Sequence, residues 1–218
     1  MIRNGLRILI ADDHDVVRSG LRHMLEAEPG WIVCGEATNG RDAVELAKEL
    51  VPDIVVLDHS MPDLNGLEAT RQIKKAVPSA EILIFTMHES EQLIRNVLAA
   101  GARGFLMKSD AARYIVLAVE ILSQHKPFFT SKVSETMLES FLRSGKEGVE
   151  PITSALTPRE REILQLLAEG NSNKKVASQL DISIKTVETH RSTIMRKVGV
   201  NSITDLVRYA IRNHYTMP

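Results

Sequence analysis

The segment DIVVLDHSMPDLNG, residues 53–66, contains an apolar strand that ends on a carboxylate. Four apolar residues, Ile54 to Leu57, are followed by Asp58 and then by a turn rich in proline, aspartate, asparagine and glycine. Ligands of open α/β sheets bind outside the carboxyl ends of the strands. A carboxylate at the end of a buried strand does not contribute to packing, so we expect Asp58 to have a chemical role.

A second apolar strand, residues 6–11, is followed directly by Asp12 and Asp13. Neighbouring carboxylates repel one another unless a cation lies between them. If the two strands are neighbours in one parallel sheet, Asp58 joins this pair. Three carboxylates at one sheet edge are ligands that Mg²⁺ prefers, and Mn²⁺ accepts the same oxygen ligands. The alternative is that each aspartate only caps the helix that follows it.

Two further strand ends carry polar groups. Residues 82–86 end on Thr86, and residues 104–107 are followed by Lys108. A hydroxyl and an ammonium group beside a carboxylate–metal site can both donate to phosphoryl oxygens and neutralise developing charge. The four strand ends together therefore predict phosphoryl chemistry.

The strand and helix patterns alternate along the first 125 residues. Strands are predicted at 6–11, 32–37, 54–58, 82–86 and 104–107, with an amphipathic helical pattern after each. This alternation predicts an α/β fold with a parallel five-stranded sheet covered by helices on both faces.

Composition indicates a soluble chain of two domains. The 218 residues are 44% hydrophobic and carry a net charge of −1. Residues 1–128 hold 14 lysines and arginines against 18 aspartates and glutamates, whereas residues 154–218 hold 10 against 6. The opposite charges of the two ends suggest different partners. We find no apolar stretch of about 20 residues and no signal-peptide pattern, so we expect a cytoplasmic protein without membrane contact.

A linker is predicted at residues 129–153. It begins with a short amphipathic helix between Val133 and Leu142 and continues as a run of small and charged residues. The first domain accordingly covers residues 1–128, and a second, smaller domain covers residues 154–218.

The second domain shows a helix-turn-helix pattern. Thr157, Pro158 and Glu160 form a helix start with a capping box. A short helix at 173–180, a turn at 181–183 and a longer helix at 184–198 follow. The second helix of such a pair enters the major groove of DNA. The alternatives are an ordinary solvated helix, or an output domain that binds protein or RNA. Candidate DNA contacts are Lys174, Lys185, Thr186, Glu188, Thr189, His190, Arg191, Ser192 and Arg196.

The strand ends, with the turn MPDLNG at 61–66, resemble the receiver domain of bacterial two-component response regulators. The resemblance implies a doubly wound sheet of strand order 2-1-3-4-5. It also implies that Asp58 accepts a phosphoryl group from a sensor histidine kinase. Asp12, Asp13, Asp58 and the backbone carbonyl of Ser60 would hold the metal, Thr86 and Phe105 would act as the switch pair, and Ser60 and His88 would tune the phosphoryl lifetime.

The segments LTPREREIL, residues 156–164, and KTVETHRSTIMRKVGV, residues 185–200, resemble the all-α four-helix DNA-binding domain of LuxR/FixJ/NarL-type regulators. The last helix, residues 202–214, would then dimerise on DNA through Ile203, Leu206, Val207, Ala210 and Ile211. The alternative is that this apolar stripe only packs on the domain core. Glu188 and Ser192 stand where some relatives carry basic residues, so no relative's operator sequence can be transferred.

The sequence therefore predicts a phosphorylation-controlled DNA-binding transcriptional regulator that is not an enzyme beyond accepting and slowly losing its own phosphoryl group. Its expected partners are a sensor histidine kinase, double-stranded promoter DNA, a second copy of the chain on DNA, and RNA polymerase. The competing class is a magnesium phosphatase with an aspartyl-phosphate nucleophile. Such an enzyme would need a second catalytic aspartate two residues after Asp58, where this chain has Ser60.

Overall fold

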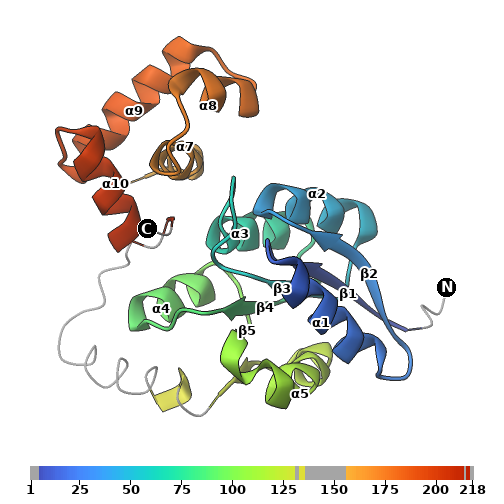
Figure 1. Ribbon diagram of the computed structural model, residues 1–218. Coiled ribbons are helices and arrows are strands. Elements are labelled where there is room, and N and C mark those ends of the chain that lie inside the picture. The colour runs from blue at the N-terminus through green and yellow to red at the C-terminus, as the bar shows by residue number, and fades with distance from the viewer. Residues whose placement is uncertain (1–4, 131–132, 136–155, 214, 217–218) are drawn as a thin grey trace.

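The computed structural model describes residues 5–130, 133–135, 156–213 and 215–216, which form an α/β domain and a helical domain (Figure 1). The α/β domain holds one parallel sheet. Its strands are β1 (Leu6–Ala11), β2 (Trp31–Ala37), β3 (Ile54–Leu57), β4 (Glu81–Thr86), β5 (Gly104–Met107) and β6 (Phe128–Phe129). The strand order is β2-β1-β3-β4-β5-β6.

The first five strands confirm the expected order 2-1-3-4-5, but the sheet has six strands and not five. The sixth, β6, pairs in parallel with β5 through Gly104–Phe128 and Phe105–Phe129. Two residues are too few to show the alternation by which a strand is recognised in a sequence. β6 also crosses position 128, where the sequence analysis placed the end of the first domain.

Helices cover both faces of the sheet (Figure 1). Alternate strand residues such as Ile8, Ile10 and Val56 pack with α1 (Asp15–Glu26) and α5 (Ala111–Ser123). Their neighbours, such as Leu9 and Val55, pack with α2 (Gly40–Leu50), α3 (Gly66–Ala76) and α4 (Glu91–Ala99). Strands buried on both faces are apolar at every position, which explains the continuous runs in the sequence.

The helical domain has four helices around one core, as predicted: α7 (Pro158–Ala168), α8 (Asn173–Gln179), α9 (Ile184–Val198) and α10 (Ile203–Arg212). The capping box at Thr157 and Glu160 is confirmed, because each side chain bonds the other residue's backbone N–H. Ser183 caps α9 by accepting from the N–H of Thr186.

The predicted linker helix between Val133 and Leu142 lies, apart from residues 133–135, outside the described residues. Val133 itself is buried in the core of the α/β domain. Within the described part of the chain, no helix has the length and apolar character needed to cross a membrane.

The two domains contact each other through α3 and α7. α7 also packs on α9, and it lies between α9 and the α/β domain (Figure 1). The recognition helix predicted from the sequence is therefore on the side of the helical domain that faces away from the sheet.

Candidate functional site

The polar side chains predicted at the strand ends meet at one edge of the sheet. Asp12 follows β1, Asp58 follows β3, Thr86 ends β4 and Lys108 follows β5. The parallel pairing of β1 with β3, β3 with β4 and β4 with β5 brings these ends together. Asp12 and Thr86 are fully buried, and Asp58 is 2% exposed.

Lys108 connects two of the carboxylates. Its Nζ lies 2.7 Å from Asp12 Oδ2 and 2.9 Å from Asp58 Oδ2. The Lys108 side chain is 9% exposed, so the ion pairs form largely out of water. A buried charge is tolerated only when it is paired, and here one ammonium group serves two carboxylates.

The surroundings shift the pKa values of this cluster. Burial raises the pKa of Asp58 and outweighs the hydrogen bond and the charge of Lys108, which act in the opposite direction, so this pKa lies above its ordinary value. Burial lowers the pKa of Lys108, but its hydrogen bonds and charge interactions with Asp12 and Asp58 outweigh burial and leave the pKa raised. Lys108 therefore stays charged and favours the ionised form of Asp58.

The acidic residues form a group that could hold a metal ion. Ligand atoms of Asp12, Asp13, His14 and Asp58 all lie within 4.8 Å of one another. His14 was not among the metal ligands predicted from the sequence. Its Nδ1 lies 3.1 Å from Asp12 Oδ1 and 2.8 Å from Asp13 Oδ1. A histidine directly after two aspartates is the signal that could have identified it.

The two predicted switch residues, Thr86 and Phe105, are fully buried. Thr86 Oγ1 accepts a hydrogen bond from the backbone N–H of His88 at 3.2 Å, and Phe105 is fully buried beside β4. The N–H of Ser60 donates to Asp58 Oδ1 at 3.3 Å. The Ser60 hydroxyl is buried and, among the described residues, has no hydrogen-bond partner.

The loop between β3 and α3 folds tightly around Asp58. Gly66 N donates to His59 O at 2.8 Å, and a Cβ at Gly66 would lie 2.2 Å from the carbonyl oxygen of Asp58. Only glycine permits this approach. Asp63 at the tip adopts a left-handed conformation with φ of 64°, which aspartate tolerates better than most residues. The turn residues that follow Asp58 in the sequence thus close this loop.

A further positioning residue, Arg18 of α1, was not predicted. Its Nη1 donates to the backbone oxygen of Asp12 at 2.7 Å, and its Nε donates to Glu36 Oε2 at 3.3 Å. It also pairs with Asp15. An arginine in an amphipathic helix looks like an ordinary surface residue, so the sequence carried no signal for this contact.

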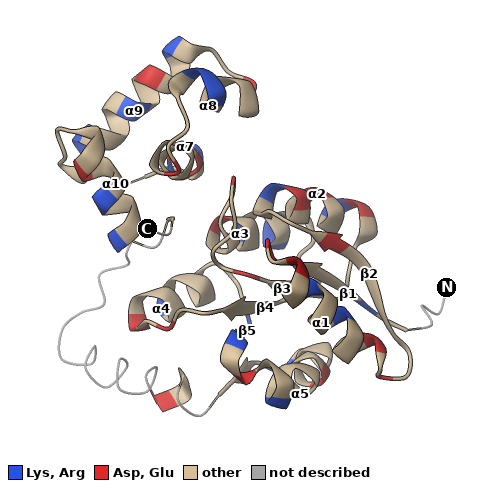
Figure 2. Ribbon diagram, viewed as in Figure 1, with Lys and Arg blue, Asp and Glu red and all other residues tan. Residues whose placement is uncertain are grey.

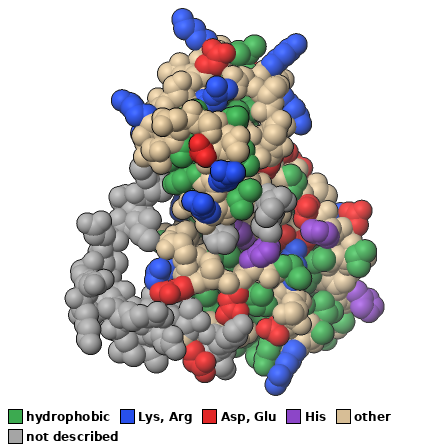
Figure 3. Space-filling model, turned by 60° about the vertical axis from the view of Figure 1, so that its left-hand side comes forward, with side chains coloured by type: hydrophobic (Ala, Val, Ile, Leu, Met, Phe, Trp, Pro, Cys, Tyr) green, Lys and Arg blue, Asp and Glu red, His purple; other side chains and the backbone are tan. Residues whose placement is uncertain are grey.

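The second candidate site is the surface of α9. None of the nine predicted DNA-contacting residues is buried, and Val187 and Ile194 hold the helix on the core. Lysines and arginines are distributed along α8, α9 and α10 (Figure 2) and project from the helical domain (Figure 3). The α/β domain therefore leaves the predicted recognition surface accessible.

The dimerisation set predicted on α10 divides between two faces of the helix. Leu206 and Ala210 are fully buried in the core of their own domain. Only Ile203, Val207 and Ile211, spaced four residues apart, remain exposed or half-exposed on one face of the helix. The wide apolar stripe thus combines a core face with a narrower outer face.

Two family descriptions match the chain. "Response regulator receiver domain" matches residues 8–120, and "Bacterial regulatory proteins, luxR family" matches residues 154–210. The chain belongs to the LuxR-type response regulators. This confirms the two resemblances drawn from the sequence, and it makes the protein a DNA-binding transcriptional regulator and not a typical enzyme.

Relatives of this response regulator match nearly its whole length. The chain is 39% identical to the transcriptional regulatory protein LiaR of Bacillus subtilis (strain 168), with 96% of this chain and 98% of LiaR covered. It is 35% identical to the oxygen regulatory protein NreC of Staphylococcus epidermidis, with 95% of this chain and 97% of NreC covered.

Solved structures agree with this assignment. The response regulator RcsB in its complex with DNA is similar, with a TM-score of 0.59 and 28% identity over 96% of this chain and 99% of RcsB. A LuxR-family response regulator from Aurantimonas sp. SI85-9A1 has a TM-score of 0.61 and 36% identity, and the match covers 63% of this chain and 99% of that one.

Proposed function

We propose that Asp58 is the phosphoacceptor and that its phosphorylation by a sensor histidine kinase controls DNA binding by α9. The observation that supports this most directly is the meeting of Asp12, Asp58, Thr86 and Lys108 at one buried edge of the sheet. An ammonium group between two carboxylates is positioned to pair with the oxygens of a phosphoryl group once Asp58 carries it.

The proposed transfer is a substitution at phosphorus. An oxygen of Asp58 forms a bond to the phosphorus of a phosphohistidine, and the phosphorus–nitrogen bond breaks. Its electron pair stays on the imidazole nitrogen of the donor. Lys108 stabilises the charge on the transferring phosphoryl oxygens, and its charge offsets part of the penalty that burial places on the ionised Asp58 needed as nucleophile.

The same residues fit a divalent cation. Asp12, Asp13, Asp58 and the backbone carbonyl of Ser60 would hold Mg²⁺, and Mn²⁺ suits the same oxygen donors. When bound, the ion neutralises negative charge on the phosphoryl oxygens. The close approach of three carboxylates supports this assignment, because their repulsion needs a compensating charge beyond that of Lys108.

Thr86 and Phe105 are the proposed route from phosphorylation to the rest of the molecule. The Thr86 hydroxyl now accepts from His88 N, and it lies on the strand next to β3. A phosphoryl group on Asp58 would accept a hydrogen bond from this hydroxyl. The movement of Thr86 would free space for Phe105 on the adjacent strand β5. Ser60 and His88 lie beside these groups and are proposed to tune the phosphoryl lifetime.

For the output, we propose that α9 enters the major groove. Lys174 and Arg196 are exposed cations suited to phosphates, whereas Thr189 and Arg191 are suited to base edges. Lys185, Thr186, Glu188, His190 and Ser192 complete this proposed surface. Two copies would pair on DNA through the outer stripe of Ile203, Val207 and Ile211. RNA polymerase is the proposed further partner, and the cytoplasm the proposed location.

Intact-mass measurement after incubation with Mg²⁺ and acetyl phosphate tests the acceptor. We expect one added phosphate on the wild type, none on Asp58→Asn, and strongly reduced uptake by Asp13→Ala that excess Mg²⁺ partly restores. The control is Asp42→Asn, which changes an exposed acid at the start of α2 and should behave as wild type. Wild-type uptake by Asp58→Asn would exclude Asp58 as the acceptor.

A further inference from the structure

Gln165 of α7 belongs to the DNA-binding domain but bonds the loop that follows Asp58. Its Nε2 donates to Met61 O at 3.0 Å, and its Oε1 accepts from Asn65 N at 2.7 Å. Nε2 also donates to Glu169 Oε1 at 2.7 Å. The residue is 1% exposed. One buried amide group thus bonds two backbone atoms of the receiver loop, four residues apart, and makes three hydrogen bonds in all.

The segment between these two contacts is the tip of the loop around Asp58. Residues 58–66 are already closed by the bond from Gly66 N to His59 O, and the loop carries the Ser60 N–H that donates to Asp58 Oδ1. Gln165 bridges the same loop from the other domain, through its bonds to Met61 O and Asn65 N. Losing Gln165 would leave Met61 O and Asn65 N without these partners at a buried place, which is unfavourable for buried backbone groups.

Other contacts between the domains flank the pair of hydrogen bonds from Gln165 to Met61 O and Asn65 N, which we call the Gln165 clamp. Arg161 Nε lies 2.7 Å from Glu68 Oε2, and Gln72 Nε2 donates to Glu162 Oε1 at 2.8 Å. These side-chain pairs join α7 to α3, beyond the loop. At the loop itself, Asn65 Nδ2 donates to Tyr215 O at 3.3 Å, and Gln179 Nε2 donates to Asp63 Oδ1 at 3.1 Å.

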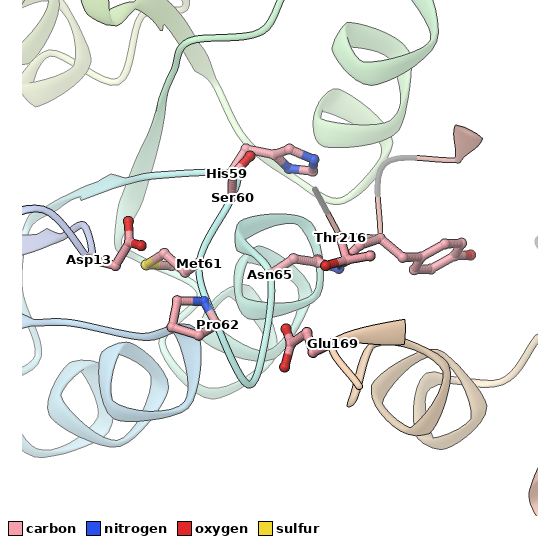
Figure 4. Close-up of a pocket in the computed structure, with 9 residues that line it drawn as sticks. Asp13, His59, Ser60, Met61, Pro62, Asn65, Glu169 and Thr216 are labelled. Atoms are coloured by element: carbon pink, nitrogen blue, oxygen red, sulfur yellow. Dashed lines mark hydrogen bonds between the residues drawn. The ribbon is translucent and has the colours of Figure 1, made fainter. Parts of the chain in front are cut away.

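A cavity of about 200 Å³ lies between the domains beside the acceptor edge (Figure 4). The receiver contributes Asp13, Ser60 and Asn65 to its lining, and the DNA-binding domain contributes Glu169, Tyr215 and Thr216. Glu169 reaches it from the end of α7 (Figure 4). The DNA-binding domain therefore forms one wall of the approach to the residues around Asp58.

We propose that Gln165 is a positioning residue that restrains the acceptor loop in a conformation that resists phosphorylation. This inference rests on Asp58 being the acceptor. The Ser60 N–H of this loop now donates to Asp58 Oδ1 at 3.3 Å, so a phosphoryl group on Asp58 would require the loop backbone to adjust. Two hydrogen bonds to its backbone, from a helix of another domain, oppose that adjustment. The DNA-binding domain thereby sets the rate at which the receiver is phosphorylated.

The test compares the full-length variants Gln165→Met and Gln72→Met. Both changes remove a glutamine that bonds across the domain interface and keep most of its volume, but only Gln165 bonds the loop. Uptake of phosphate from acetyl phosphate with Mg²⁺ is followed by intact mass over time. We expect Gln165→Met to react about threefold to tenfold faster than wild type, the range expected from about one net hydrogen bond. Gln72→Met should stay within about twofold.

Hydrogen exchange provides a readout that general loosening of the interface does not reproduce. The amide of Asn65 should exchange faster in Gln165→Met and at the wild-type rate in Gln72→Met. Equal or slower phosphorylation of Gln165→Met, or equal effects of both variants, would overturn the proposal. If Gln165→Met does not fold, Gln165→Glu is read in the same way, because its carboxylate cannot donate to Met61 O.

The Asp58→Asn variant separates this proposal from the assignment of the acceptor. If it still takes up phosphate at the wild-type rate, the acceptor assignment is wrong. If Asp58→Asn takes up none while Gln165→Met and wild type react equally fast, only the Gln165 clamp is wrong.

Discussion

The two candidate sites differ in how exposed their polar side chains are. At the acceptor edge, Asp12 and Asp58 are buried, and both pair with Lys108, whose side chain is 9% exposed. On α9, the proposed DNA contacts are exposed or half-exposed, and the Thr189 hydroxyl donates within its own helix to Lys185 O. Groups that stabilise developing charge are effective when held in place before the reaction. Groups that read DNA have to remain accessible to the base edges.

The largest expected effect tests the buried side of this comparison. Lys108→Met should leave Asp12 and Asp58 facing each other, so the free energy of unfolding should fall by about 3–5 kcal/mol without divalent ions. Added Mg²⁺ should restore part of this loss by binding only the folded state. Chemical denaturation with and without Mg²⁺ measures both effects.

Lys185→Met on α9 is the matched control for this experiment, because it removes a lysine that is exposed. Its free energy of unfolding should change by no more than about 0.5 kcal/mol. A similar loss of stability in both lysine variants would contradict the distinction between the two sites.

The second prediction separates the two faces of α10. Leu206→Ala removes a fully buried side chain and should lower the free energy of unfolding by about 2–4 kcal/mol. Ile203→Ala, at a side chain that is 44% exposed, should cost much less stability but weaken pairing on DNA. Thermal unfolding and sedimentation with a palindromic duplex distinguish the two results. Normal pairing of Ile203→Ala would mean that the outer stripe is not the dimer contact.

The third prediction concerns DNA. Thr189→Ala or Arg191→Ala should each lose about 1–3 kcal/mol of discrimination at particular base positions. Lys174→Ala and Arg196→Ala should weaken binding to all sequences alike and reduce the salt dependence by about one unit for each lost phosphate contact. Binding selections at two salt concentrations test this, and half-sites should lie about one helical turn apart. If every variant lost the same affinity for all DNA sequences, α9 would not be reading base edges.

The smallest expected effect involves Glu160, whose Oε1 and Oε2 lie 2.8 and 2.7 Å from Lys197 Nζ. Burial raises the pKa of Glu160, but Lys197 and the Thr157 N–H outweigh it, so the pKa is lowered on folding. The ionised carboxylate therefore stabilises the fold above its unfolded pKa of about 4.3, and this contribution disappears as pH falls through the folded pKa.

Glu160→Gln should consequently reduce the free energy of unfolding by about 1 kcal/mol at pH 7. The difference from wild type should shrink as pH falls through the folded pKa, and urea unfolding at pH 7 and at pH 3 gives the comparison. A difference that persists unchanged at pH 3 would show that packing, and not the charge, is responsible. Asp58, whose pKa is raised, is the opposite case, because its ionisation is disfavoured by the fold.

The acceptor edge was predictable because its signals are local. A buried strand must be apolar, so a carboxylate, hydroxyl or ammonium at its end stands out, and parallel pairing brings such ends together. The helix starts at Thr157 and Ser183 were predictable for the same reason, since a cap and its partner lie within three residues.

The missed features all depend on contacts between distant segments. Strand β6 forms because Phe128 and Phe129 pair with β5. The role of Arg18 depends on where β1 ends. Gln165 looks like a surface residue of α7 until a second domain covers it. On α10 the periodicity identified an apolar stripe but could not divide it between the core and the outside.

The chemistry of the domain contact has a consequence for building chimeric regulators. Gln165 bonds only backbone atoms of the receiver, which every receiver with a loop of this shape presents whatever its side chains. The pairs Arg161–Glu68 and Glu162–Gln72 depend on side-chain identity. Gln179 of α8 also donates to the side chain of Asp63 at 3.1 Å. A foreign receiver fused to this DNA-binding domain would thus keep the two bonds to Gln165, but it would need matching side chains at positions 63, 68 and 72 to keep the other pairs.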